Sequence, residues 1–230
     1  MRAPGTVALL LAVAVLPLAA QEDAKQLEGR CTGGEGYACV RLAQVIVQGI
    51  GVRQEWARAE ALSLRGCDLG KPEGCTQLGH WLQQGLVLDP DDKRAAALFS
   101  RACEAGDPEG CDALSLAYER GTGVIDNIRT SVGLAIKACD GAVRNACFRL
   151  GDRYERGDEV FPSESRAAGY YARACDLEDA NSCVRLARMY EDGRGVRQDL
   201  RRAVAYYRRA CDVGNSQACQ LATLRAEGLM

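Results

Sequence analysis

The chain has 230 residues, a formal net charge of −2 at pH 7, 12 cysteines and a single histidine. A nearly neutral chain lacks the concentrated positive charge of nucleic-acid-binding proteins, so we expect no nucleic-acid partner. One histidine excludes a zinc centre built from two or three imidazoles, and we expect neither a metal ion nor another cofactor.

Residues 1–20 have the pattern of a secretory signal peptide. Arg2 is followed by a ten-residue apolar run, a proline and then small residues before Gln21. We expect cleavage near Ala20 and a secreted or periplasmic protein. The apolar run is too short to cross a bilayer, which disfavours a transmembrane anchor, so we expect no membrane insertion after cleavage.

The twelve cysteines follow a strict period. They form six Cys-x7-Cys pairs, and each pair begins 36 residues after the previous one: Cys31 and Cys39, Cys67 and Cys75, Cys103 and Cys111, Cys139 and Cys147, Cys175 and Cys183, Cys211 and Cys219. Leucines, glycines and small residues recur with the same period, which is typical of a repeat array. The period predicts an N-terminal cap, five repeats and a C-terminal half repeat or cap, at 21–30, 31–66, 67–102, 103–138, 139–174, 175–210 and 211–230.

Each repeat is predicted to contain two antiparallel helices. In the repeat at 175–210, apolar residues from Cys183 to Tyr190 recur at helical spacing, and Gly193 ends this first helix. Asp199 begins the second helix, at the position that Asp91, Asn127 and Ser163 occupy in other repeats. Stacked helix pairs of this kind form an all-α fold, a right-handed α-solenoid with a concave and a convex face.

The cysteine spacing favours six structural disulfides. Structural zinc prefers cysteines two to four residues apart, and a redox centre would use Cys-x-x-Cys. An even number of cysteines in an exported chain favours disulfides instead. If each first cysteine pairs with the one eight residues later, every cysteine has a partner. If Cys39 instead pairs with Cys67, and so on along the chain, Cys31 and Cys219 remain unpaired.

These features resemble the Sel1-like repeat (SLR) family, which is similar in fold to tetratricopeptide arrays. The shared motif combines Cys-x7-Cys, a leucine eleven residues along, a tyrosine fifteen along and Gly-x-Gly-Val, which is intact at 49–52, 121–124 and 193–196. The sequences at 85–88 and 157–160 depart from it. The paired cysteines resemble the exported, Helicobacter-type cysteine-rich (Hcp) branch. The resemblance implies an adaptor scaffold, and it also implies binding of penicillin-like β-lactams, with weak β-lactamase activity in several members.

The residues themselves give no independent support for hydrolase chemistry. A serine β-lactamase would contain Ser-x-x-Lys, Ser-Asp-Asn and Lys-Thr-Gly, and none of these occurs after residue 20. A Gly-x-Ser-x-Gly nucleophile elbow is also absent. We therefore expect no enzyme, and the alternative is a β-lactamase whose catalytic residues are unknown.

Polar side chains on the first helices form the candidate binding site. The residues that we expect on the concave face are Arg41, His80, Trp81, Arg149, Asp152, Arg153, Arg185 and Arg188. A row of guanidinium groups can bind carboxylates in bidentate geometry, which fits a protein, a peptide or a peptidoglycan fragment. A solvated helix face is the plainer interpretation of any single arginine, and we expect Trp81 to pack rather than to stack on a ligand.

Two further columns of the repeat are interpreted structurally. Glu119, Glu155 and Glu191 are predicted to pair with arginines of the same or the next repeat. The tyrosines at inner-face spacing are predicted to be core residues: Tyr154, Tyr170, Tyr171, Tyr190, Tyr206 and Tyr207. The leading hypothesis is an exported scaffold that binds a partner in its concave groove. A β-lactam-binding hydrolase and a purely structural spacer are the alternatives.

Overall fold

The computed structural model describes residues 24–86 and 89–228, so the predicted signal peptide lies outside the described residues. Within them the chain is entirely helical, as expected. The helices are α1 (Ala24–Thr32), α2 (Gly36–Gln48), α3 (Trp56–Asp68), α4 (Glu73–Gln84), α5 (Asp92–Glu104), α6 (Pro108–Arg120), α7 (Ile128–Asp140), α8 (Arg144–Arg156), α9 (Glu164–Asp176), α10 (Ala180–Asp192), α11 (Leu200–Asp212) and α12 (Ser216–Glu227).

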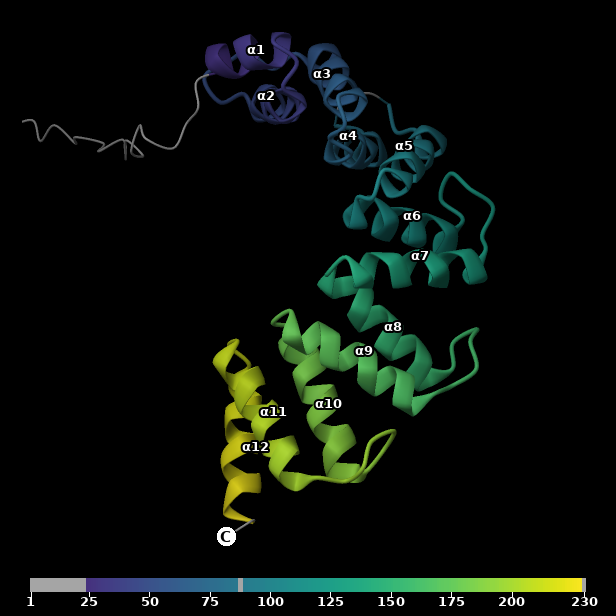
Figure 1. The fold of residues 1–230 in the computed structure, drawn as a ribbon, viewed down its shortest axis with the longest axis vertical. Helices are drawn as coiled ribbons and strands as arrows, with labels where there is room; N and C mark the ends of the chain where they lie inside the picture. The colour runs from purple at the N-terminus through teal and green to yellow at the C-terminus, as the bar shows by residue number, and fades with distance from the viewer. Residues whose placement is uncertain (1–23, 87–88, 229–230) are drawn as a thin grey trace, which may run out of the picture.

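The helices stack in chain order into a curved array, with α1 at one end and α12 at the other (Figure 1). The main packing contacts join consecutive helices. The loops at 121–127, 157–163 and 193–199 project from the same edge of the array (Figure 1). This arrangement confirms the predicted α-solenoid.

Polar N-caps and glycine C-caps determine where the helices begin and end. The side chains predicted to cap second helices accept hydrogen bonds from backbone N–H groups of the first turn: Asp91, Asn127, Ser163 and Asp199. Five first helices end at a left-handed glycine with φ between 64° and 75°: Gly49, Gly85, Gly121, Gly157 and Gly193. Glycine adopts this conformation without the steric cost that a Cβ atom imposes, so the 36-residue glycine column fixes the helix ends.

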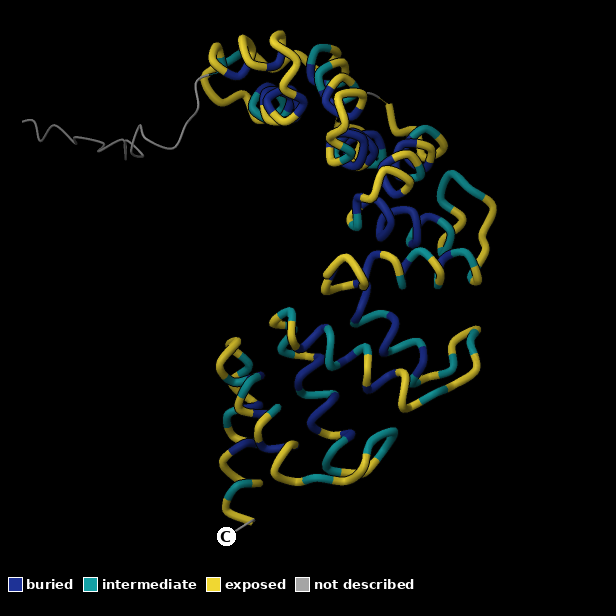
Figure 2. Tube along the Cα trace, viewed as in Figure 1, coloured by how far each residue is buried: buried dark blue, intermediate teal, exposed yellow. Residues whose placement is uncertain are grey.

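The buried residues form three separate clusters along the array instead of one central core. Burial is concentrated where neighbouring helices face one another (Figure 2). The leucine column of the first helices is at most 6% exposed: Leu42, Leu78, Leu114, Leu150 and Leu186. Stability therefore comes from a series of interfaces between neighbours, as expected for a solenoid.

The tyrosines divide into two groups. Tyr154, Tyr171 and Tyr207 are buried, as predicted. Tyr171 packs so closely on α8 that a Cβ atom at Gly151 would lie 2.7 Å from its ring. Three tyrosines predicted to be core residues are only half-buried: Tyr170, Tyr190 and Tyr206. Helical spacing predicts which side of a helix faces its neighbours. Residues at the edge of that side are only partly covered by the neighbouring helices.

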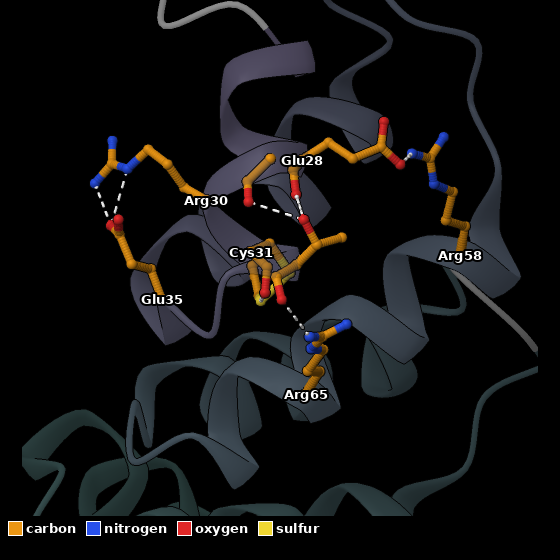
Figure 3. Close-up of a disulfide and its surroundings, with 9 residues drawn as sticks. Glu28, Arg30, Cys31, Glu35, Arg58 and Arg65 are labelled. Carbon is orange, nitrogen blue, oxygen red and sulfur yellow. Dashed lines mark hydrogen bonds and ion pairs between the residues drawn. A yellow bond between two sulfur atoms is a disulfide. The ribbon is translucent and has the colours of Figure 1, made fainter.

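The six disulfides confirm the predicted pairing of each cysteine with the one eight residues later. Each bond joins the end of one helix pair to the start of the next, as in the link from α1 to α2 through Cys31 (Figure 3). Ten of these cysteines are buried, whereas Cys211 and Cys219 at the C-terminal end are half-buried.

Six disulfides indicate an oxidising, extracytoplasmic environment. Among the helices of the described ranges, none has the length and apolar character needed to cross a membrane.

Candidate functional site

The candidate site lies on the first-helix row, which we define as α2, α4, α6, α8, α10 and α12. Arginines of this row reach back to carboxylates of the preceding first helix. Arg149 of α8 donates to both oxygens of Asp112 in α6, at 2.7 and 3.2 Å. One turn further along, Arg153 pairs with Glu119 at 3.0 Å. Both guanidinium groups are thus held by the protein itself, and Arg149 has the bidentate geometry that was predicted for a ligand carboxylate.

The same pattern continues toward the C-terminus. Arg185 of α10 lies 3.4 Å from Glu155 and 3.9 Å from Asp152. Arg194 also donates to Glu155, at 3.1 Å, and Arg225 of α12 pairs with Glu191. The predicted role of Glu119, Glu155 and Glu191 as partners of arginines is confirmed. The ion pairs connect four successive first helices, and their acceptor carboxylates are mostly sheltered from solvent.

Three predicted site residues remain exposed on the first-helix row. Arg41 donates to Gln44 within its own helix at 2.9 Å, and Arg188 is exposed near Tyr207. The ring of His80 lies 5.0 Å from that of Phe99. Trp81 is only 8% exposed and belongs to the core, which agrees with the prediction that it packs.

His80 is the single imidazole of the chain. Partial burial lowers its pKa below the usual value, while the nearby carboxylates of Asp107 and Asp112 act in the opposite direction. A neutral imidazole can both donate and accept a hydrogen bond. This position can therefore bind polar or planar groups of a partner at neutral pH.

Two buried tyrosines anchor the second helices to the glutamates of the row. Tyr171 donates to Glu155 at 2.7 Å, and Tyr207 donates to Glu191 at 3.0 Å. Burial, together with the adjacent carboxylate, raises the pKa of both phenols, and that of Tyr207 to about 12. Each phenol must be protonated to donate its hydrogen bond. The two bonds link Glu155 and Glu191 to the buried tyrosines of the second helices.

We expect Tyr207 to stabilise the fold less as the pH rises above 10. The ordinary tyrosine pKa is about 10, so between pH 10 and 12 the unfolded chain releases this proton more readily than the folded chain. The difference in free energy of unfolding between wild type and Tyr207→Phe should accordingly narrow from pH 9 to pH 11 in urea titrations. A difference that stays constant or grows over this range would contradict the assignment.

Four serines of the described residues are buried. Ser63, Ser115, Ser131 and Ser182 are at most 1% exposed. Ser115 donates to the backbone oxygen of Ser131, 2.9 Å away. The described residues also contain no group of histidine, cysteine and carboxylate side chains that could hold a metal ion. No feature of this geometry favours the β-lactamase alternative.

Comparison with protein families identifies the repeat. A sequence model of the Sel1 repeat matches residues 36–71, 72–107, 108–142, 144–179 and 180–215. The chain belongs to the Sel1 repeat family. Sel1 repeats form non-enzymatic scaffolds that commonly mediate protein interactions. With the family's boundaries, each of the four inner disulfides joins one repeat to the next. Among curated proteins, none matches the chain.

Two of the solved structures to which this chain is similar share its fold. The c5321 protein, described as a protective antigen of uropathogenic Escherichia coli strains with an SLR fold, is 24% identical, with a TM-score of 0.76 over 86% of this chain and 42% of that one. A Sel1 repeat protein from Oxalobacter formigenes is 23% identical, with a TM-score of 0.77 over 87% of this chain and 58% of that one. Cysteine-rich protein B of Helicobacter pylori is 32% identical over 60% of this chain and 98% of that one, with a TM-score of 0.45. The chain thus spans about half the length of the first two.

Proposed function

We propose that the chain is an exported interaction scaffold and that the first-helix row, on the concave side of the array, binds a partner protein or peptide. The observation that carries this proposal is the continuous set of ion pairs from Asp112 to Arg225. Together with the disulfides, these pairs hold α6, α8, α10 and α12 in fixed relative positions. A rigid surface loses little conformational entropy on binding, which favours recognition of an extended partner.

The exposed polar residues of the row are the proposed contacts. Arg41 occupies the repeat position of Arg149, and His80 and Arg188 occupy that of Asp152. Arg41, His80 and Arg188 are exposed, whereas the bracing arginines Arg149, Arg153 and Arg185 are half-buried. They can donate hydrogen bonds to carboxylates and backbone carbonyls of the partner without breaking an inter-repeat ion pair.

A quantitative capture experiment tests this proposal. The oxidised chain is immobilised, and proteins retained from the extracytoplasmic fraction of the source cells are measured by mass spectrometry. We expect the variant Arg41→Gln/His80→Gln/Arg188→Gln to lose a protein that wild type retains. The matched control is Arg53→Gln/Arg197→Gln/Arg201→Gln, which removes exposed arginines outside the row and should retain that protein. If both variants retain the same proteins as wild type, the row is not the binding surface, and a chain that retains none fits a structural spacer.

A further inference from the structure

One repeat position of the second helices is occupied by an arginine in most repeats, and the partner of this arginine differs along the array. The residues are Arg58, Arg94, Arg166 and Arg202. In the first two repeats, Arg58 pairs with Glu28 (Figure 3), and Arg94 pairs with Glu60. Both carboxylates belong to the preceding second-helix position, in α1 and α3 respectively. The arginine of this column is thus neutralised from within the chain at the N-terminal end.

At the same repeat position in α9, Arg166 has no such carboxylate among the residues that the structure describes. The positions that correspond to Glu28 and Glu60 are occupied by Ile136 and Val132 in α7. Arg166 instead lies over the ring of Tyr154, 5.4 Å from its centroid, and donates a long hydrogen bond of 3.4 Å to the tyrosine hydroxyl. A guanidinium group has five N–H donors, so this single bond leaves most of them available to another acceptor.

A groove lies between α7 and α9 at this position. Its volume is about 510 Å³, and its lining includes Ile136, Tyr154, Arg166, Gly169 and Tyr170. The two tyrosine rings stack at 5.7 Å with an interplanar angle of 9°. At the far wall, Arg173 is fixed by a bond of 2.7 Å to Asp140. The groove therefore combines an aromatic wall with a cation that lacks an internal carboxylate.

Gly169 lines this groove. A Cβ atom at this exposed position would meet no atom within 4 Å, so packing does not require a glycine here. Glycine inside a helix costs roughly 0.5–1 kcal/mol relative to alanine. The corresponding residues are Ala61 and Ala97 in the first two repeats and Gly133 in α7. The open space at Gly169 leaves room for another chain to approach α9 beside the groove.

The next repeat contains a partial copy of the arrangement. Tyr190 and Tyr206 stack at 5.5 Å, and Arg202 lies 5.6 Å from the centroid of Tyr190. Here, however, the carboxylate of Asp199 lies 3.5 Å from Arg202 and partly neutralises the positive charge of the guanidinium group. The corresponding residue in the α7–α9 groove is Ser163, which is neutral. Arg166 is therefore better placed than Arg202 to donate hydrogen bonds to an external carboxylate.

We propose that the α7–α9 groove binds a glutamate side chain from an acidic segment of a partner protein. The carboxylate would accept from Arg166, as Glu28 does from Arg58 in the first repeat, while the aliphatic stem would pack on Tyr170 and Ile136. A nearby apolar side chain of the partner can contact Phe161, which is 95% exposed in the loop before α9. This site is separate from the first-helix row and does not depend on its proposed function.

Fluorescence anisotropy with a fluorescein-labelled peptide of alternating glutamate and leucine tests the proposal. We expect wild type to bind this peptide at least tenfold more tightly than the same peptide with glutamine in place of glutamate. Ile136→Glu restores the internal carboxylate found in the first repeat and should weaken peptide binding at least tenfold without lowering the melting temperature. Ile136→Gln is the matched control: it removes the same apolar contact without supplying a carboxylate, so it should bind the peptide more tightly than Ile136→Glu does.

A second variant tests whether filling the groove with a larger side chain prevents peptide binding. Gly169→Leu favours the helix and fills open space, so it should raise the melting temperature while abolishing peptide binding. Gly133→Leu makes the same change at the corresponding position of α7, where the space is also open, and should leave binding intact. Equal binding of both peptides to wild type, or unchanged binding to Ile136→Glu, would overturn the proposal. Binding that is lost only in the Arg41/His80/Arg188 variant would place the peptide on the first-helix row instead.

Discussion

Replacing Cys139 and Cys147 with alanine is expected to lower the free energy of unfolding by about 2.6 kcal/mol. This magnitude follows from the chain entropy released when a covalent loop of nine residues is opened in the unfolded state. Both cysteines are at most 1% exposed and lie in the middle of the array, so the loss affects interfaces on both sides. Urea denaturation of the oxidised double variant, followed by far-UV circular dichroism, measures it.

The matched comparison is Cys211→Ala/Cys219→Ala at the C-terminal end. This disulfide closes a loop of the same length but is half-buried, and it joins α11 to α12, the last helix of the described residues. In a nearest-neighbour array, a terminal unit can unfold without the others. We expect its removal to unfold α12 locally and to shift the main transition less than removal of the Cys139–Cys147 bond. Equal shifts for the two variants would show that the array unfolds as one unit.

Replacing Arg149 with alanine is expected to cost about 2 kcal/mol of stability. The substitution leaves Asp112, whose side chain is only 12% exposed, without its two charge-assisted hydrogen bonds. Arg201→Ala, on an exposed part of α11, is the control and should change stability by less than about 0.5 kcal/mol. Thermal and urea denaturation of both variants provide the measurement.

A double variant separates this structural role from ligand binding. Arg149→Met/Asp112→Leu removes both charges and supplies apolar side chains, so it should recover most of the stability that Arg149→Ala loses. If Arg149→Ala is as stable as wild type but fails to retain a partner, then Arg149 acts on a ligand and the ion pair contributes little. Loss of stability without loss of the partner is the result that we expect.

The repeat made most of the fold predictable, because its columns encode local chemistry. The cap residues Asp91 and Asp199 lie where the sequence placed them, and so do the terminating glycines and the disulfides. Each of these features depends on residues fewer than ten positions apart. Such contacts are fixed by helix geometry and can be read from spacing alone.

The candidate site was less predictable, because it depends on which repeat supplies each partner. Arg149 and Asp112 are 37 residues apart, and their pairing requires the offset between successive first helices. The sequence predicted the glutamate column as arginine partners but treated the arginine row as free for a ligand. The α7–α9 groove was missed altogether. The sequence does contain an indication of this groove. The position three residues before the first cysteine of a pair is Glu28 at the N-terminal end but Ile136 in α7.

The position of the disulfides also determines how the molecule responds to cleavage outside the cell. Each bond spans the short turn between two helix pairs, so a protease that cuts between Cys103 and Cys111 divides the polypeptide without releasing either part. A cut in the loop at 121–127, on the edge away from these turns, has no covalent link across it in the described chain. Resistance to digestion thus depends on the loops between α6 and α7 and between α8 and α9, where Ile125 and Phe161 are exposed. A partner that covers this edge would also protect the array from degradation.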